Sequence, residues 1–181
     1  MYGVVLHFDS KTESIINNLW KGLRDSGISN YAYEIQNRRP HLTLADYSDL
    51  EEPQYKELFD QYYESASRMS LTFNMLGTFI NSGALFLSPN PTRELIELHF
   101  KHHTHFKEYS QFSNSMYSPE RWIPHCTIAN RLSNQQLLEA LQYSTNRLEM
   151  IEAEVQEISF MKIRNQDNKK VVETIHRKEL I

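Results

Sequence analysis

Two copies of one six-residue word stand out in the sequence. Pro-His-Leu-Thr-Leu-Ala at 40–45 returns as Pro-His-Cys-Thr-Ile-Ala at 124–129, so Pro, His, Thr and the final Ala recur at matching positions. In a β-strand, residues two apart point to the same side, so each copy places an imidazole beside a hydroxyl on one sheet face. Because imidazoles transfer protons near neutral pH, each copy predicts half of an acid–base site.

The two halves together would suit displacement at phosphorus. If His41 and His125 face each other across a cleft, one neutral imidazole can remove a proton from the attacking group while the other, protonated, supplies the leaving oxygen. Thr43 and Thr127 would hydrogen-bond the non-bridging phosphoryl oxygens and stabilise the charge that develops there. These four side chains need neither a metal ion nor a cofactor, and we expect neither.

A single His-x-Thr match carries little weight in a chain with 8 histidines. A third match, His102 to Thr104, lies in a stretch with helical spacing, where residues two apart diverge by about 200°. The alternative for the two strand copies is that both histidines only satisfy hydrogen bonds within a sheet. Repetition of the longer word in matching contexts favours the site.

The first copy follows a strand, a helix and a loop. β-branched and aromatic residues at 3–8 predict a central strand. Apolar residues at helical spacing follow, with Ser10 as the predicted N-cap, Glu13 completing a capping box and Gly27 as the stop. A short edge strand is predicted at 31–35.

The second copy repeats this order. Within 84–130 we predict a strand at 84–88, a helix at 92–108 and a loop at 109–123 before the second motif. The other predicted elements are helices at 53–68 and 133–145, strands at 71–80, 153–163 and 171–176, and a turn at 165–168. Duplicated units often form lobes related by a pseudo-twofold axis. The expected fold is therefore α+β and bilobal, with two pseudo-symmetric lobes of mainly antiparallel sheet, outer helices and a central cleft carrying both His-x-Thr motifs.

Composition sets limits on partners and location. With 181 residues, 40% apolar and 23% charged, we expect one bilobal domain over 1–181 and a monomer. A net charge of −4 argues against a broad surface for duplex DNA but permits a phosphate in a locally basic pocket. No apolar run is long enough to span a bilayer, no signal peptide is evident, and Cys126 is the sole cysteine. We expect a cytoplasmic protein without membrane contact.

The paired motifs resemble those of the two-histidine phosphoesterase superfamily, which includes RNA 2′,3′-cyclic phosphodiesterases and 2′-5′ RNA ligases. The resemblance rests on His41-Leu-Thr43 and His125-Cys-Thr127, each on a predicted strand with apolar neighbours. It implies that the two histidines are the acid–base pair and the two threonines are phosphate ligands. The implied substrate is a nucleotide or RNA end with a 2′,3′-cyclic phosphate, or a 2′-5′ linkage.

Several alternatives stay open. The implied enzyme hydrolyses its substrate, and the same side chains would also serve the reverse 2′-5′ ligation. The sequence does not assign acid and base, because the two motifs are nearly symmetric. The rival hypothesis is a non-catalytic protein that binds a nucleotide or RNA end in the same cleft.

Further residues are candidates for holding the substrate. Arginines beside the motifs can steer a phosphate, and aromatic residues can stack on a base. The histidine of the predicted first strand can point into the cleft. Each is weighed against an ordinary role as a solvated turn or core residue. The substrate-binding candidates are His7, Tyr33, Arg39, Arg121, Trp122 and Arg131.

Histidines also gather at 99–105. His99 and His103 are one helical turn apart, which would suit a metal, but no carboxylate or cysteine at matching spacing completes a ligand set. We therefore predict no metal site and an exposed polar helix face there. Cys126, between His125 and Thr127, should point into the core on the opposite side of its strand.

Overall fold

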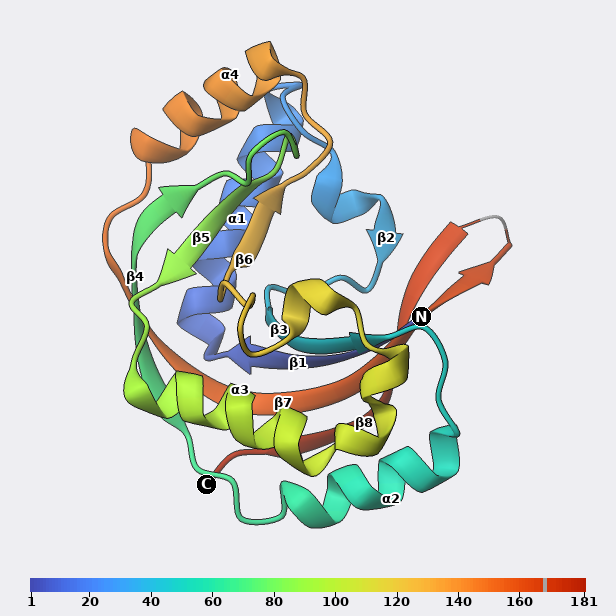
Figure 1. Ribbon diagram of the computed structural model, residues 1–181. Coiled ribbons are helices and arrows are strands. Elements are labelled where there is room, and N and C mark those ends of the chain that lie inside the picture. Colours follow the sequence, from blue (N-terminus) through green and yellow to red (C-terminus); the bar gives the residue numbers. More distant parts are fainter. Residues whose placement is uncertain (168) are drawn as a thin grey trace.

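The computed structural model describes residues 1–167 and 169–181. Over these residues the strands form one eight-stranded sheet, in which the long strand β7 (Ile151–Gln166) connects two halves. Along one edge, β7 pairs first with β4 (Met69–Gly77) and then with β8 (Lys169–Glu179). Its other edge pairs with β1 (Tyr2–Phe8). One strand therefore forms the floor of both lobes (Figure 1).

Each lobe completes its part of the sheet with a motif strand. In the first lobe, β3 (Leu42–Tyr47) pairs with β1, and the two-residue β2 (Ile35–Gln36) pairs with β8. In the second lobe, β5 (Leu85–Pro89) lies between β4 and β6 (Cys126–Ala129). Every pairing is antiparallel except that of β2 with β8, among the described residues. The predicted α+β fold with two lobes of mainly antiparallel sheet is confirmed.

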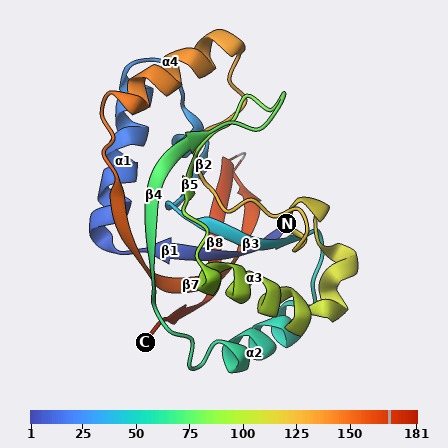
Figure 2. The same cartoon turned by 60° about the vertical axis from the view of Figure 1, so that its left-hand side comes forward.

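The helices do not stay with the strands that flank them in sequence. Helix α1 (Ser10–Asp25) packs on β6, and α3 (Arg93–His105) packs on β3. Thus the helix of each sequence repeat covers the motif strand of the other repeat. Helix α4 (Asn134–Thr145) lies beside α1 and β5, and α2 (Glu52–Tyr62) lies on β8, so the helices cover opposite ends of the sheet (Figure 2).

Helix α1 begins one residue earlier than the sequence suggests. Asp9, not Ser10, is the N-cap, because its carboxylate accepts hydrogen bonds from both the backbone N–H and the hydroxyl of Thr12. Asp9 also accepts from the backbone of Glu154 in β7, which fixes the helix to the sheet. The predicted capping role of Ser10 was wrong. At the other end, Gly27 adopts a positive φ of 70° just after the helix.

Irregular segments account for most of the other differences. The predicted strand at 31–35 is a 3₁₀ turn at Tyr31–Tyr33 followed by β2. The loop before the second motif contains 3₁₀ turns at Lys107–Phe112 and Ser115–Tyr117. These short turns lack the periodicity that marks longer elements. The predicted turn at 165–168 includes Asn168, which lies outside the described residues.

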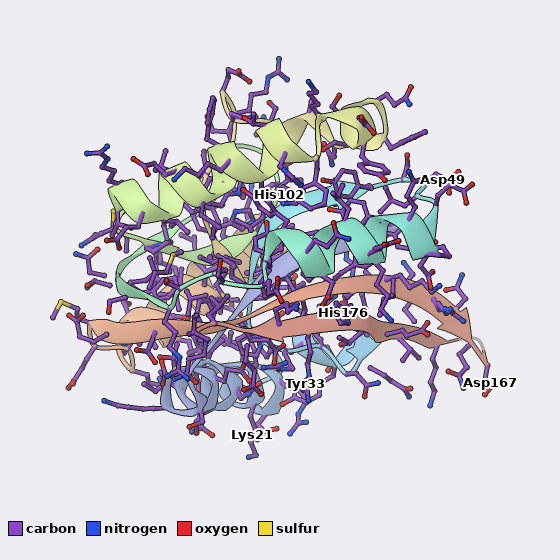
Figure 3. All side chains as sticks on the ribbon, turned by 90° about the horizontal axis from the view of Figure 1, so that it is seen from below. Lys21, Tyr33, Asp49, His102, Asp167 and His176 are labelled. Atoms are coloured by element: carbon purple, nitrogen blue, oxygen red, sulfur yellow. The ribbon has the colours of Figure 1, made fainter. Side chains whose placement is uncertain are left out.

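An aromatic core fills the space between the first lobe and helices α2 and α3. Its largest fully buried side chains include Tyr47, Tyr55, Phe59, Tyr63 and Phe160. His102 of α3, labelled in Figure 3, is fully buried among them. Its two ring nitrogens hydrogen-bond with the hydroxyls of Tyr47 and Tyr63.

The histidine face of α3 was predicted wrongly as exposed. His99 is 2% exposed and His102 is completely covered, so this face is turned inward. The neutral imidazoles are tolerated there because each finds hydrogen-bond partners in the core. No helix among the described residues is long and apolar enough to cross a membrane.

Candidate active site

The two motif histidines are held by the same kind of hydrogen bond to the backbone. Each stands one residue before its strand, with Leu42 opening β3 and Cys126 opening β6. The Nδ1 of His41 donates to the carbonyl of Arg39 at 2.6 Å, and the Nδ1 of His125 donates to that of Ile123 at 2.7 Å. A carbonyl can only accept, so the proton of each neutral ring sits on Nδ1. In both residues Nε2 is thus the atom left for chemistry.

The two motif threonines are also supported alike, each from the other sequence repeat. The indole N–H of Trp122 donates to the carbonyl of Thr43 at 2.9 Å, and that of Trp20 donates to the carbonyl of Thr127 at 3.3 Å. These bonds hold the strand backbone that carries the hydroxyls. The exchange of helices between the lobes is what brings Trp20 of α1 under β6.

One cavity of about 620 Å³ is lined by all four motif side chains. Two tyrosines enter it as well, one beside each threonine: Tyr31 next to Thr127 and Tyr117 next to Thr43. Burial raises the pKa of both tyrosines, to about 12 for Tyr117, so their hydroxyls stay protonated. Cys126 is buried on the other side of β6, as predicted.

The surroundings of the two histidines differ in charge. Burial, together with the positive charges of Arg38, His125 and Arg39, lowers the pKa of His41 to about 4 despite the bond to the Arg39 carbonyl. Burial also lowers the pKa of His125, which has apolar neighbours instead. The rings of Phe79 and Phe86 lie 5.0 and 5.3 Å from its ring. The cations make His41 the more firmly neutral of the two.

A network of ion pairs lies behind His41. The guanidinium of Arg39 donates to Glu13 of α1 and to Glu157 of β7, both at 2.8 Å. Glu157 also accepts a 2.7 Å hydrogen bond from Ser159. The burial of Glu157 opposes its ionisation, but Ser159 and Arg39 outweigh that effect and lower its pKa. This network fixes the residue whose carbonyl orients His41.

His7 joins the same network from β1. Its Nδ1 donates to the carbonyl of Pro40 at 2.9 Å, and its ring lies 6.1 Å from that of His41. Burial, followed by the nearby charges of His41 and Arg39, lowers the pKa of His7 to about 3, so the ring is neutral. His7 lines the cavity and also holds the peptide that precedes His41.

Only part of the predicted substrate-binding set lines this cavity. His7 and Arg39 do, whereas the other four side chains lie elsewhere. Tyr33 is covered by the guanidinium of Arg24 at 4.2 Å, and Arg131 pairs with Glu34. Trp122 stacks on His99 behind Thr43, and Arg121 is exposed. Contact of these residues with a substrate stays a prediction.

Three residues that lie directly beside the motif side chains escaped the sequence interpretation. Tyr31 and Tyr117 both precede their motif by a short irregular segment, and this shared position was the available signal. Phe79 lies in the connection after β4, and no local pattern placed it against His125. Contacts of this kind depend on how distant segments meet.

The histidines of α3 are engaged in hydrogen bonds with the protein. His99 donates from Nε2 to the carbonyl of Tyr117 at 2.9 Å, and His103 donates to that of Leu44 at 3.1 Å. Within the part of the chain that the structure describes, no three His, Cys, Asp or Glu side chains are grouped to hold a metal ion. Through these hydrogen bonds, His99 holds the loop before the second motif and His103 holds the backbone of β3.

Solved structures of similar fold cover almost the whole chain. E. coli LigT complexed with 3′-AMP superposes with a TM-score of 0.67 at 14% identity, over 99% of this chain and 96% of that chain. A protein described as a phosphoesterase gives 0.67 at 15% identity, over 99% and 97%. The protein TT0787 of Thermus thermophilus gives 0.66 at 13% identity, over 99% and 97%.

A family model extends the agreement from fold to sequence. No protein with a curated description matches the chain. The model of the 2′-5′ RNA ligase superfamily, in contrast, matches residues 12–167, a span that contains both motifs and most of the sheet. The chain therefore belongs to the 2′-5′ RNA ligase superfamily.

Proposed function

We propose that the protein is a phosphodiesterase that hydrolyses a cyclic phosphate at a nucleotide or RNA end, or a 2′-5′ linkage, by two-histidine acid–base catalysis. The observation that carries the proposal is the shared geometry of the motifs. Two imidazoles with Nδ1 bound to a backbone carbonyl, and two threonines, line one cavity. LigT, whose structures include complexes with 3′-AMP, ATP and phosphate, supports a phosphate-containing ligand.

In the proposed reaction, a water molecule attacks phosphorus and the bond to one ribose oxygen breaks. The Nε2 of one histidine takes the water proton, and the Nε2 of the other donates a proton to the departing oxygen, so no net charge is created on the protein. Thr43 and Thr127 donate to the non-bridging oxygens as negative charge accumulates there. Ligation would use the same side chains with the 5′-hydroxyl of a second RNA end in place of water: its oxygen attacks phosphorus, the bond to the 3′ ribose oxygen of the cyclic phosphate breaks, and a 2′-5′ linkage remains.

The asymmetry in charge favours one assignment of roles. Arg38 and Arg39 hold His41 neutral, which suits it to accept the proton of water. His125 has aromatic neighbours instead, so the negative charge of a bound phosphate can raise its pKa and leave it protonated. We therefore assign proton removal to His41 and proton delivery to His125.

The setting of the reaction follows from the chain itself. Both halves of the site come from one chain, which supports a monomer acting as a single domain over 1–181. The lone buried Cys126 fits a reducing compartment such as the cytoplasm. The proposed partner is an RNA end or nucleotide, and neither duplex DNA nor a membrane is involved.

Single alanine variants of the two histidines test the proposal. His41→Ala and His125→Ala should each lower kcat/KM for a 2′,3′-cyclic nucleotide by about 10²–10⁴-fold, because each removes one proton transfer. Product formation would be followed by phosphorus NMR or mass spectrometry. The matched control is His105→Ala, since His105 lies on the exposed side of α3.

Two outcomes would contradict it. Full activity in both histidine variants would remove the acid–base assignment, and loss of wild-type activity on addition of a chelator would show that a metal takes part. Tight nucleotide binding without any product at any pH would instead identify a binding protein.

A further inference from the structure

The cavity continues beyond the motifs onto the inner face of the β7–β8 hairpin. Paired residues on that face form three rows, Met161 with Thr174, Ile163 with Val172, and Asn165 with Lys170. All six line the same cavity as the histidines and threonines. The proposed reaction uses none of them, although they make up a large part of the cavity wall.

Gly3 lies at the bottom of the cavity, between the motif side chains and the hairpin face, and its lack of a side chain leaves that space open. It lies in β1 opposite Asp46 of β3 on one side and Met161 of β7 on the other. A Cβ at this position would stand 3.4 Å from the end of the Met161 side chain, where a longer side chain would narrow the passage. Because Gly3 adds nothing to the floor, the motif end and the hairpin end are continuous.

The hairpin end is too far from the motifs for one nucleotide to occupy both. Val5 is opposite Thr43 on one side and Ser159 on the other, so Ser159 marks the level of the motif along β7. The row of Asn165 and Lys170 lies six residues farther on, about 20 Å at ~3.3 Å per residue. Stacked nucleotides are spaced by about 3.4 Å. A strand of several nucleotides would be needed to span the distance.

The side chains of this face are suited to binding RNA bases and, at the far end, a backbone phosphate. Its middle is apolar, from Met161, Ile163 and Val172, and its far end carries the amide of Asn165 and the ammonium of Lys170. Burial of flat bases against apolar side chains is favourable, and a lysine can neutralise one backbone phosphate. On the opposite face of the hairpin, Arg164 is instead paired with Glu173. Lys170, in contrast, brings its positive charge to the wall of the cavity.

We propose that the inner face of the β7–β8 hairpin binds the nucleotides that precede the terminal phosphate of a single-stranded RNA, with bases against Met161, Ile163 and Val172 and a backbone phosphate at Lys170. The inference rests on the proposed function for the placement of the terminal phosphate at the two threonines. It selects an RNA end, rather than a free cyclic nucleotide, as the preferred substrate.

Binding of two product-like ligands tests this site without requiring turnover. The probes are uridine 3′-monophosphate and a uridine tetranucleotide with a 3′-phosphate, measured by competition against a fluorescent tetranucleotide. The wild type should bind the tetranucleotide at least ~10-fold more tightly than the mononucleotide, since extra bases and phosphates add contacts. Lys170→Gln should lower the slope of log affinity against log salt by about 0.7 for the tetranucleotide only.

Lys169, the residue next to Lys170, provides a matched control. Lys169→Gln removes the same charge from the adjacent residue, which points to the other side of the strand and does not line the cavity. It should leave both affinities unchanged within about twofold. Ile163→Asp should lower the affinity for the tetranucleotide by about 10-fold or more and leave the affinity for the mononucleotide unchanged, because it puts a negative charge on the apolar middle of this face. Circular dichroism checks that each variant is folded.

Each result separates this inference from the proposed function. The hairpin site would be overturned by equal wild-type affinities for the two ligands, or by equal losses of tetranucleotide affinity in Lys169→Gln and Lys170→Gln, even if cyclic nucleotides are hydrolysed. A loss of affinity in Lys170→Gln for the tetranucleotide alone supports the hairpin site, and it would do so even if no substrate were turned over.

Discussion

The two halves of the active site are alike where they meet the substrate and unlike behind it. His41 and His125 share the bond from Nδ1 to a carbonyl, and Thr43 and Thr127 share the support of an indole. Behind His41, however, lies a network of ion pairs centred on Arg39, whereas His125 is backed by aromatic rings. The shared parts position the reacting atoms, and the unshared parts set the protonation of each imidazole.

The same contrast extends to the lobes. Three almost completely buried histidines, His7, His99 and His102, belong to or pack on the first lobe. Each is kept neutral because burial lowers its pKa, to about 3 for His7 and about 4 for His99. The strands of the second lobe carry no comparable group among the described residues. The first lobe should therefore be the one that responds to acid.

Acidification should give the largest effect. Unfolding frees these three histidines to bind protons below their ordinary pKa of 6.5, whereas in the folded state the pKa is about 3 for His7, about 4 for His99 and well below 6.5 for His102. The folded state thus loses stability as the pH falls from 6.5, by roughly 2 kcal/mol at pH 5 for each of His7 and His99. Urea unfolding at pH 7 and pH 5 measures the difference.

Hydrogen exchange at the same two pH values locates the effect. After correction for intrinsic rates, protection should fall more in β1 and β3 than in β5 and β6, because His7 belongs to β1 and His102 hydrogen-bonds with Tyr47 of β3. Equal free energies of unfolding at pH 7 and pH 5 would show that these imidazoles are not held neutral.

Removal of the central arginine should come next in size. Arg39→Met leaves Glu13 and Glu157 partly buried without their shared cation, and should cost about 2 kcal/mol of unfolding free energy. The value is below that of a fully buried pair because the Arg39 side chain is 41% exposed. The pKa of His41, followed by NMR, should rise, since a nearby positive charge is lost.

His125 is the internal reference for this variant. Its pKa shift comes from burial without any contribution from Arg39, so it should hardly change. Arg121→Met, at an exposed position, controls for the loss of net charge. Parallel shifts of both histidines would show that the two halves are not electrostatically distinct.

The indoles should give the smallest effects. Trp122→Phe and Trp20→Phe each remove one hydrogen bond to a motif carbonyl while keeping an aromatic ring, and should cost about 1 kcal/mol or slightly more. Trp122→Phe should have the larger effect on kcat, because its bond is 2.9 Å long against 3.3 Å for Trp20. Unfolding midpoints and kcat for a cyclic nucleotide test the pair. The reverse order would contradict the ranking.

Much of the fold could be predicted because its signals are local. The strand preceding each motif, the amphipathic helices and the duplicated word all follow from residue types within short windows. The inward face of α3 was also readable, since Leu95, His99, His102 and Phe106 fall at helical spacing on one side. It was missed because histidine was taken as a polar surface residue.

The remainder depends on contacts between distant segments. Nothing near Trp20 in the sequence reveals that its indole reaches the carbonyl of Thr127. Likewise, Arg39 seemed suited to a phosphate, but Glu13 and Glu157 come to it from α1 and β7. Only the packing of the lobes decides which cations are already paired.

The crossing of helices between the repeats has a consequence for the history of the fold. If a single ancestral repeat once existed, its helix could not have covered its own motif strand in the present arrangement, because α1 lies on β6 and α3 on β3. Two copies would have had to trade helices, as in a domain-swapped dimer. Fusion of the copies into one chain would then have preserved that exchange, and with it the mutual dependence of the two halves.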